Sequence, residues 1–294
     1  MLLKKDALVR LFLRPAIKQT YTKSMALYPK TALYLLLFLS STTLYGAFQQ
    51  FDSNCQNDLS TGEFSEVARV RYIHDGDTLH LSGGRKVRLI GINTPELARN
   101  NKPAEPFAHQ AKTALEDLFS QDKTIALVYG AERMDKYGRL LAHAFTRDGT
   151  NVQSSLLKQG VASAITIPPN TRFARCYLEA EQQARCNRAG MWQYNGIINA
   201  KNLKQGETGF NLIKGMVKKV TFNKKGIWLN LDDMLTLGIR SEEQYLFDQK
   251  ALRLLQDQTI VVRGWINKGR HDTPYYMRIK DPLSLQQESA LSCR

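Results

Sequence analysis

The chain has 294 residues, of which 43% are hydrophobic and 23% are charged. This composition excludes a mainly disordered chain and one embedded in a membrane throughout, and the length favours two domains over one. Lys and Arg outnumber Asp and Glu by 41 to 27, and the net charge of +14 favours polyanionic partners such as nucleic acid or anionic lipid, because clustered cations displace counterions from phosphates.

Residues 1–47 predict a targeting segment. Several Lys and Arg residues precede an apolar run over 32–39, which is the order found in a signal peptide. Gly46-Ala47 offers a cleavage site, and a start at Met25 would leave a more compact signal. The alternative is an uncleaved anchor over 31–48, which is barely long enough to span a bilayer. We therefore expect an exported protein, periplasmic or secreted, that is either released by cleavage or tethered to the membrane.

Four cysteines suit an exported protein, because disulfides persist outside the reducing cytosol. Cys176 and Cys186 fall in one expected helix and lie about 15 Å apart along its axis, which is too far for them to bridge each other. A bridge from Cys55 to Cys176 or to Cys186 would staple the pre-domain segment 48–66 to that helix. Unpaired buried thiols are the alternative.

From residue 67 onward, short strands bounded by turns predict a small barrel. Strands are expected at 67–73, 78–81, 86–92, 124–128 and 140–145, and helices at 107–119, 151–159 and 171–189. Thr171 is the expected N-cap of the last helix, and Gly190 ends it. This order indicates a mainly β fold with α (α+β), an OB-fold five-stranded β-barrel with three helices over 67–192.

A second, small β-rich domain is expected at 210–285, after a polar, Gly- and Asn-rich linker at 193–209. Its strands are expected at 212–222, 226–231, 235–239 and 259–267, with a helical stretch over 242–255. Another OB-type fold is one interpretation of this series. Residues 286–294 are expected to form a tail.

Aromatic and basic residues are interleaved in this second domain. The aromatic residues are Trp228, Trp265, Tyr275 and Tyr276, and the basic ones are Lys218, Lys219, Lys224, Lys225, Lys268 and Arg270. The mixture suits a surface that stacks on single-stranded nucleic acid and binds its phosphates. It equally suits an ordinary core with a solvated basic face, so both interpretations stay open.

Four separated motifs in the first domain combine oxygen ligands, a carboxylate and two arginines. They are Asp75-Gly76-Asp77-Thr78, Arg88 in Val-Arg-Leu-Ile, Asn93-Thr94-Pro95-Glu96 and Asp135-Lys136-Tyr137-Gly138-Arg139. The two acidic turns supply hard oxygens that suit Ca²⁺. The two arginines suit a phosphate, since a planar guanidinium donates two parallel hydrogen bonds and stays charged.

Phosphodiester hydrolysis needs a deprotonated water, stabilised charge on the phosphoryl oxygens and a tolerated leaving oxygen. Glu96 is the candidate base, a cation at Asp77 would polarise the phosphate, and Arg88 with Arg139 would neutralise the developing charge. Each motif alone is common in loops and strands that have no catalytic role. Their conjunction, in order and with complementary roles, favours a site.

The order, spacing and strand context of these motifs resemble the thermonuclease (staphylococcal nuclease) family, over a segment that ends in Gly190-Met191-Trp192. The resemblance implies a Ca²⁺-dependent nuclease on an OB-fold barrel, which acts on DNA and often RNA and leaves 3′-phosphate ends. For the metal, the resemblance implies calcium ligands at Asp77, at Asn93 and at the carbonyl of Thr94, with Asp75 supporting the site. For the reaction, it implies a general base at Glu96 and phosphate and transition-state contacts at Arg88 and Arg139. It also implies substrate contacts at Lys136 and Tyr137.

Two departures from the family's pattern change these expectations. Asn93 stands where the best-known members have Asp, so the site has one negative charge fewer and should bind Ca²⁺ more weakly or accept another divalent ion. Ala164 and Thr166 stand where those members place tyrosines near a nucleotide base. Neither residue has an aromatic ring for the family's base-stacking contacts.

The leading hypothesis is a calcium-dependent endonuclease whose partner is DNA, RNA or both, with no protein partner predicted. A second hypothesis is a nucleic-acid-binding module on the same fold whose catalysis has decayed. Asn93 keeps that hypothesis open, whereas the intact Glu96, Arg88 and Arg139 argue against it. A third takes the basic N-terminus as a membrane-surface device and the barrel as a docking domain.

Overall fold

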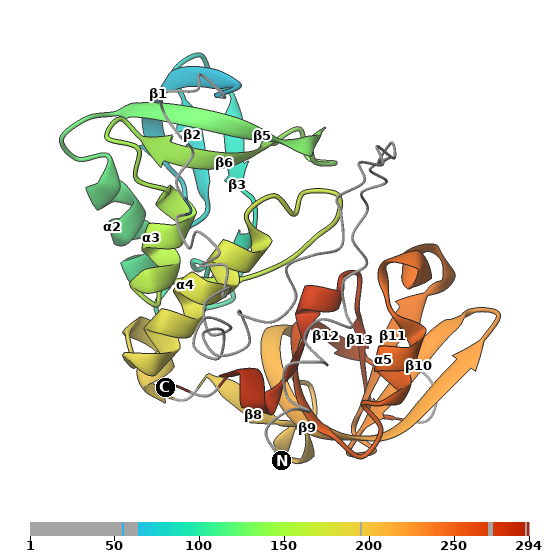
Figure 1. Ribbon diagram of the computed structural model, residues 1–294. Helices are drawn as coiled ribbons and strands as arrows, with labels where there is room; N and C mark the ends of the chain where they lie inside the picture. Colours follow the sequence, from blue (N-terminus) through green and yellow to red (C-terminus); the bar gives the residue numbers. More distant parts are fainter. Residues whose placement is uncertain (1–54, 56–63, 195, 270–272, 292, 294) are drawn as a thin grey trace, which may run out of the picture. The chain divides into compact units, whose positions relative to one another are not determined.

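A computed structural model describes residue 55 and residues 64–194, 196–269, 273–291 and 293 (Figure 1). The expected targeting segment and most of the pre-domain segment lie outside these residues. In the part of the chain that is described, no helix is long and apolar enough to cross a membrane.

The first domain is a closed barrel of five strands in the order β1-β2-β3-β6-β5. The strands are β1 (Glu66–Ile73), β2 (Thr78–Leu81), β3 (Lys86–Leu89), β5 (Thr124–Met134) and β6 (Leu140–Thr146). β3 and β6 run parallel, and the other neighbouring pairs are antiparallel. Alternate residues such as Leu79, Val87 and Leu89 are fully buried, as closure of a two-faced sheet requires. The predicted OB-fold barrel is confirmed.

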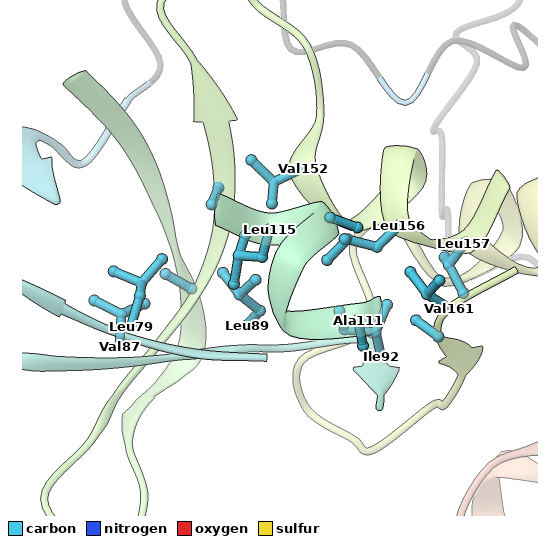
Figure 2. Close-up of a cluster of buried hydrophobic side chains, with 14 of the residues drawn as sticks. Leu79, Val87, Leu89, Ile92, Ala111, Leu115, Val152, Leu156, Leu157 and Val161 are labelled. Carbon is cyan, nitrogen blue, oxygen red and sulfur yellow. The ribbon is translucent and has the colours of Figure 1, made fainter. Parts of the chain in front are cut away.

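Three helices cover the open end of this barrel. They are α2 (Ala108–Leu118), α3 (Val152–Lys158) and α4 (Ala174–Cys186). Figure 2 shows Leu115 of α2 beside Leu89 of the barrel, and both belong to one buried cluster with Leu156 of α3. The N-cap of α4 is Phe173 rather than the expected Thr171, and no side-chain hydrogen bond caps the helix.

The expected strand 86–92 is interrupted at Gly91. Gly91 has φ +85°, and a Cβ at this position would lie 2.5 Å from the Tyr177 ring. Beyond it the chain continues as β4 (Ile92–Asn93), which pairs with β7 (Ser163–Ala164) outside the barrel. This close approach of a buried ring turns the chain away from the barrel and toward the residues of the site.

The second domain repeats the topology of the first. Its closed ring is β9 (Gly209–Asn223), β10 (Gly226–Leu231), β11 (Leu235–Arg240), β13 (Tyr275–Arg278) and β12 (Thr259–Lys268). β11 and β13 run parallel, as β3 and β6 do, and the short α5 (Gln249–Arg253) precedes β12 as α2 precedes β5. The second OB-type barrel is therefore confirmed.

The structure corrects two predicted boundaries. The stretch 193–209, expected to be a linker, contains β8 (Ile197–Asn199), which runs parallel to β9. The first two residues of the stretch 286–294, which was expected to be a tail, belong to β14 (Leu285–Gln287). This strand pairs with β12. Both strands have three residues, too few to show the alternation by which a strand is recognised in a sequence.

Two disulfides hold the two ends of α4. Cys55 pairs with Cys176, one of the two partners left open for it, at a Cα–Cα distance of 5.6 Å. Cys186 pairs with Cys293 at a Cα–Cα distance of 5.3 Å. The helix is thus linked to the segment before the first barrel and to the chain beyond the second.

A buried ion pair joins α4 to the second barrel. Arg263 of β12 donates from Nη1 to Oε2 of Glu181, and the two side chains are 2% and 0% exposed. Both ions also bind the main chain of Ala164: its N–H donates to Glu181 at 3.1 Å, and its carbonyl accepts from Arg263 at 2.9 Å. Apolar residues from both sides of this contact pack together, namely Ala184, Trp192, Leu212 and Val261.

Substitution of Arg263 by Leu is expected to lower the free energy of unfolding by about 3 kcal/mol or more, because the buried Glu181 would keep as its counter-ion only Arg185, whose Nε lies 4.0 Å from Oε1. Urea unfolding measures the change. The double substitution Glu181→Leu/Arg263→Leu should recover only part of the loss, since it removes both charges of the pair but also takes away the carboxylate beside the buried Arg185. A single variant as stable as the parent chain would contradict this account of the junction.

A buried histidine stands in the first barrel. His143 of β6 is 2% exposed, its Nδ1 lies 2.8 Å from the Tyr177 hydroxyl, and its ring packs edge-on against Phe173. Burial lowers the pKa of His143 to about 3, and the Arg172 guanidinium adds to the effect. The folded protein therefore holds this imidazole neutral.

Stability should consequently fall as the pH drops from about 7.5 to about 5.5, because the unfolded chain takes up a proton near pH 6.5 that the folded chain does not. The contribution of His143 to the free energy of unfolding is fully present above the pKa of the unfolded chain. It decreases on acidification, by about 1 kcal/mol over that interval. Urea unfolding at the two pH values measures it. His143→Gln should reduce the difference, whereas the exposed control His109→Gln should not; equal pH slopes in all three proteins would refute the assignment.

Candidate active site

The acidic turn between β1 and β2 buries one carboxylate. Asp77 is 6% exposed, and its N–H donates to Asp75 Oδ1 at 3.1 Å, which folds the turn on itself. A Cβ on Gly76 would lie 2.6 Å from Ala111 of α2 and 2.9 Å from Thr94, so only glycine allows this approach. The turn therefore packs between α2 and the loop that carries Thr94 and Glu96.

Asp77 is the centre of a polar cluster. Its Oδ2 lies 2.8 Å from Nη2 of Arg88 and accepts from the Thr94 N–H at 3.3 Å, while its Oδ1 accepts from the Thr78 hydroxyl at 3.1 Å. Burial raises the pKa of Asp77 and Asp75 adds to the rise, whereas Arg88 and the hydrogen bonds oppose it. Three of the four predicted motifs therefore meet at this carboxylate.

Arg88 is held on both sides of its guanidinium. Besides the ion pair with Asp77, it donates to the carbonyl of Leu89 and to that of Ile92, the latter at 3.1 Å. The side chain is only 15% exposed, and it lines the cleft described below. Its orientation is therefore set before any ligand arrives.

Glu96 follows on the loop after β4. Its N–H donates to Glu105 Oε2 at 3.0 Å and its carbonyl accepts from the Glu105 N–H at 2.9 Å, which fixes the backbone while the side chain forms no hydrogen bond with the described residues. Partial burial raises the pKa of Glu96, and the charges of Asp77, Asp75 and Glu105 raise it further. A carboxyl group that takes up a proton more readily than usual suits general-base work.

The fourth motif forms the turn between β5 and β6. Asp135 accepts from the N–H groups of Tyr137 and Arg139, both at 2.9 Å, and its Oδ2 accepts from Arg139 Nε at 2.7 Å. Arg139 also reaches Thr78 Oγ1, at 3.4 Å, which brings this turn to the acidic turn. Tyr137 is 71% exposed, and the Lys136 ammonium lies 5.0 Å from its ring centre.

One cleft of about 1460 Å³ collects these side chains. The predicted site residues that line it are Asp75, Asp77, Arg88, Asn93, Glu96, Lys136, Tyr137 and Arg139. Thr94 is buried behind them and touches Asp77 through its N–H. The cleft also has a wall that the motifs do not predict, made by Tyr72, His74, His80 and Lys112 of the first barrel with Trp265 and Lys280 of the second.

Two histidines of this wall, His74 and His80, lie beside one tyrosine. Tyr72 packs against His74 and His80, with ring centres 6.4 and 5.7 Å apart, and the Lys112 ammonium lies 5.3 Å from the Tyr72 ring. Alternation along β1 and β2 gives a signal for this cluster, since Tyr72, His74 and His80 share one face. The sequence names Trp265 as one residue of a possible stacking surface in the second domain, but it does not indicate that Trp265 or Lys280 lines this cleft.

Oxygen donors dominate the corner of the cleft around Asp77. No group of three or more His, Cys, Asp or Glu side chains able to hold a metal is found among the described residues. The donors that the resemblance implies for a metal here are the carboxylates of Asp75 and Asp77, the Asn93 amide and the Thr94 carbonyl. Hard oxygens of this kind fit Ca²⁺, and the pKa of Asp77 is raised chiefly by burial, with the charge of Asp75 adding to the rise.

Replacing Asn93 by Asp should strengthen Ca²⁺ binding by about tenfold, because it adds a charged oxygen ligand to this set. Isothermal titration of the folded chain with Ca²⁺ measures the affinity directly, without reference to activity. Asn202→Asp, a matched change on an exposed residue that precedes the second barrel, is the control. Equal effects of the two substitutions would show that Asn93 is not a ligand position.

Comparisons with known proteins agree with this geometry. The family model described as staphylococcal nuclease homologue matches residues 86–194. The SPbeta prophage-derived endonuclease YokF of Bacillus subtilis is 33% identical over 151 residues, which cover 50% of this chain and 47% of that protein. Endonuclease YncB of the same organism is 34% identical over 128 residues, or 42% and 60% of the two chains. The thermonuclease of Staphylococcus intermedius is 32% identical over 138 residues, or 46% and 80%.

The chain belongs to the staphylococcal nuclease family, as the four motifs predict. It spans about half of the length of YokF and three fifths of that of YncB. The second barrel lies beyond the segment that the family model matches.

Proposed function

We propose that this chain is a calcium-dependent nuclease that hydrolyses phosphodiester bonds of DNA, RNA or both, and that it acts as an endonuclease. The observation that carries the proposal is the single cleft in which Asp77, Arg88, Glu96 and Arg139 meet. The names of the relatives, two endonucleases and a thermonuclease, support it.

Glu96 is the group that would accept a proton from the attacking water. Its side chain has no hydrogen-bond partner in the described part of the chain, while its backbone is held by Glu105. The raised pKa keeps its basicity above that of an ordinary carboxylate, so the proton it receives is held more firmly.

Arg88 and Arg139 would stabilise the charge that builds up on the phosphoryl oxygens. Each is positioned by a carboxylate, Asp77 for the first and Asp135 for the second, and each keeps N–H groups beyond those already bound. Donors fixed in advance avoid the cost of reorganisation during the reaction. Lys136 and the exposed Tyr137 would contact the neighbouring nucleotide.

Asp77, Asn93 and the carbonyl of Thr94 would hold the Ca²⁺ ion, and Asp75 would support them. The bound ion would neutralise a phosphate oxygen and polarise the phosphorus. Because Asn93 provides an uncharged amide, another divalent ion is an alternative occupant of this site.

A second candidate function is a binding module on the same fold with decayed catalysis. The observation that favours it is again Asn93, which leaves the oxygen cluster one carboxylate short of the pattern in the best-known family members. Binding of nucleic acid without cleavage, whichever metal is present, would identify this alternative.

Glu96→Gln should reduce kcat on single-stranded DNA by about a hundredfold or more, since the amide cannot take a proton from water. Cleavage by the chain from Cys55 onward is measured with Ca²⁺, with Mg²⁺ and with EDTA. Glu116→Gln, on the exposed face of α2, is the matched control. Undiminished turnover in Glu96→Gln would remove Glu96 from the mechanism, and cleavage in EDTA would remove the metal.

We also propose that the protein is exported, periplasmic or secreted, and cleaved from or tethered by its N-terminal segment. The two disulfides support this, because such bonds persist in oxidising compartments. Fractionation of the producing cells tests it: recovery in the cytosol with reduced cysteines would contradict export.

A further inference from the structure

The cleft of the proposed active site continues onto the second barrel. Trp265 of β12 and Lys280, which follows β13, line it together with the catalytic groups. A smaller adjoining cavity of about 120 Å³ shares Ile165, Ile167, Trp265 and Lys280 with the cleft. These shared residues make one continuous surface that begins at the acidic turn and ends on the second barrel.

Trp265 presents a supported aromatic ring to this surface. It stands directly opposite Phe210 in the β9–β12 pairing, and the two rings meet edge to face with centres 5.2 Å apart. The residue is 43% exposed, although most large apolar side chains of this barrel are buried. A ring braced on one side and open on the other suits stacking on a base.

Lys280 supplies an available positive charge beside this ring. It is exposed and forms no ion pair within the described residues. Arg278, two residues earlier, is by contrast bound to Glu242 and Glu243. The charge of Lys280 is therefore free to meet a phosphate, as that of Arg278 is not.

The junction between the barrels fixes where Trp265 stands. Arg263, two residues before it on β12, forms the buried ion pair with Glu181 and binds the carbonyl of Ala164. Ala164 and Thr166 are themselves 1% and 7% exposed, so neither offers a surface to a base. Beside this segment, the braced ring that lines the cleft is Trp265 of the second barrel.

We propose that Trp265 and Lys280 form a binding subsite for a single-stranded segment of the substrate that flanks the scissile phosphodiester. The proposal rests on the proposed nuclease function and names a substrate class for it. Trp265 would stack on an unpaired base, and Lys280 would contact the adjoining phosphate. A single strand fits this chemistry because the bases of a duplex are already stacked on one another.

The test compares single-stranded oligonucleotides of about three and about twelve nucleotides, because only the longer one can reach from the active site onto a flanking subsite. Trp265→Ala should raise KM for the longer substrate by about tenfold and leave kcat unchanged. Neither constant should change for the shorter substrate. Trp265→Phe, which keeps a ring, should recover most of the affinity.

Lys280→Ala should weaken binding of the longer strand and lower the slope of log affinity against log salt by about one. Matched controls are Tyr245→Ala, an 81% exposed ring of the second barrel outside the cleft, and Lys250→Ala, an exposed lysine of α5. Both controls should behave as the parent chain does. Thermal unfolding of each variant shows whether the fold is kept.

A binding measurement separates failure of this inference from failure of the nuclease proposal. Fluorescence anisotropy with the Glu96→Gln chain and a labelled twelve-nucleotide strand needs no turnover. If the parent chain cleaves, and the Trp265→Ala variant binds and cleaves the long strand as the parent does, only the subsite would be overturned. If the parent chain does not cleave, but Trp265→Ala weakens binding of the strand, only the nuclease proposal would be overturned. If Trp265→Ala weakens binding of a duplex more than binding of the single strand, the proposed substrate class would be overturned.

Discussion

The site depends on one constraint, the burial of the Asp77 carboxylate. A charge taken out of water must be paired and hydrogen-bonded, and Asp77 finds its partners in Arg88 of β3, in Thr94 of the next loop and in Thr78 of its own strand. The contacts of the Asp77 carboxylate therefore hold β2, β3 and the loop after β4 together. Glu96 lies two residues beyond Thr94, so the position of the candidate base follows from the same contacts. Gly76 makes the arrangement sterically possible.

A comparable constraint on α4 sets the position of the second barrel. Glu181 is fully buried, and Arg263 reaches it across the junction while both bind the main chain of Ala164. The disulfide from Cys186 to Cys293 closes the same contact covalently. Because Arg263 and Trp265 share strand β12, the buried ion pair that joins the barrels also sets the wall of the cleft. Residues two apart on a strand point to the same face, so the face of β12 that carries the buried Arg263 also carries Trp265.

Features set by residues close together in the chain could be predicted from the sequence, whereas features set by contacts between distant segments could not. The barrel strands could be predicted because alternation is local, and the site because Asp77, Arg88, Glu96 and Arg139 lie in motifs of recognisable order. The three-residue strands β8 and β14 could not, since they are defined by pairing with distant strands. The partner of Cys186 and the place of Trp265 in the cleft depend on the packing of two domains, which no local pattern encodes. Chemical roles were thus easier to predict than the surfaces that surround them.

The repeated topology shows how little of the chemistry resides in the fold. The connection between the first two strands of the first barrel is the acidic turn with Asp75 and Asp77, whereas the equivalent connection in the second, between β9 and β10, carries Lys224 and Lys225. An acidic turn can hold a cation, while a basic one repels cations and favours phosphate. With the same strand order, the two barrels therefore differ in the sign of the charge that they offer at the same place. Function in this family of barrels is set by loop residues on a common frame, so a second barrel can extend a substrate surface without duplicating the catalytic centre.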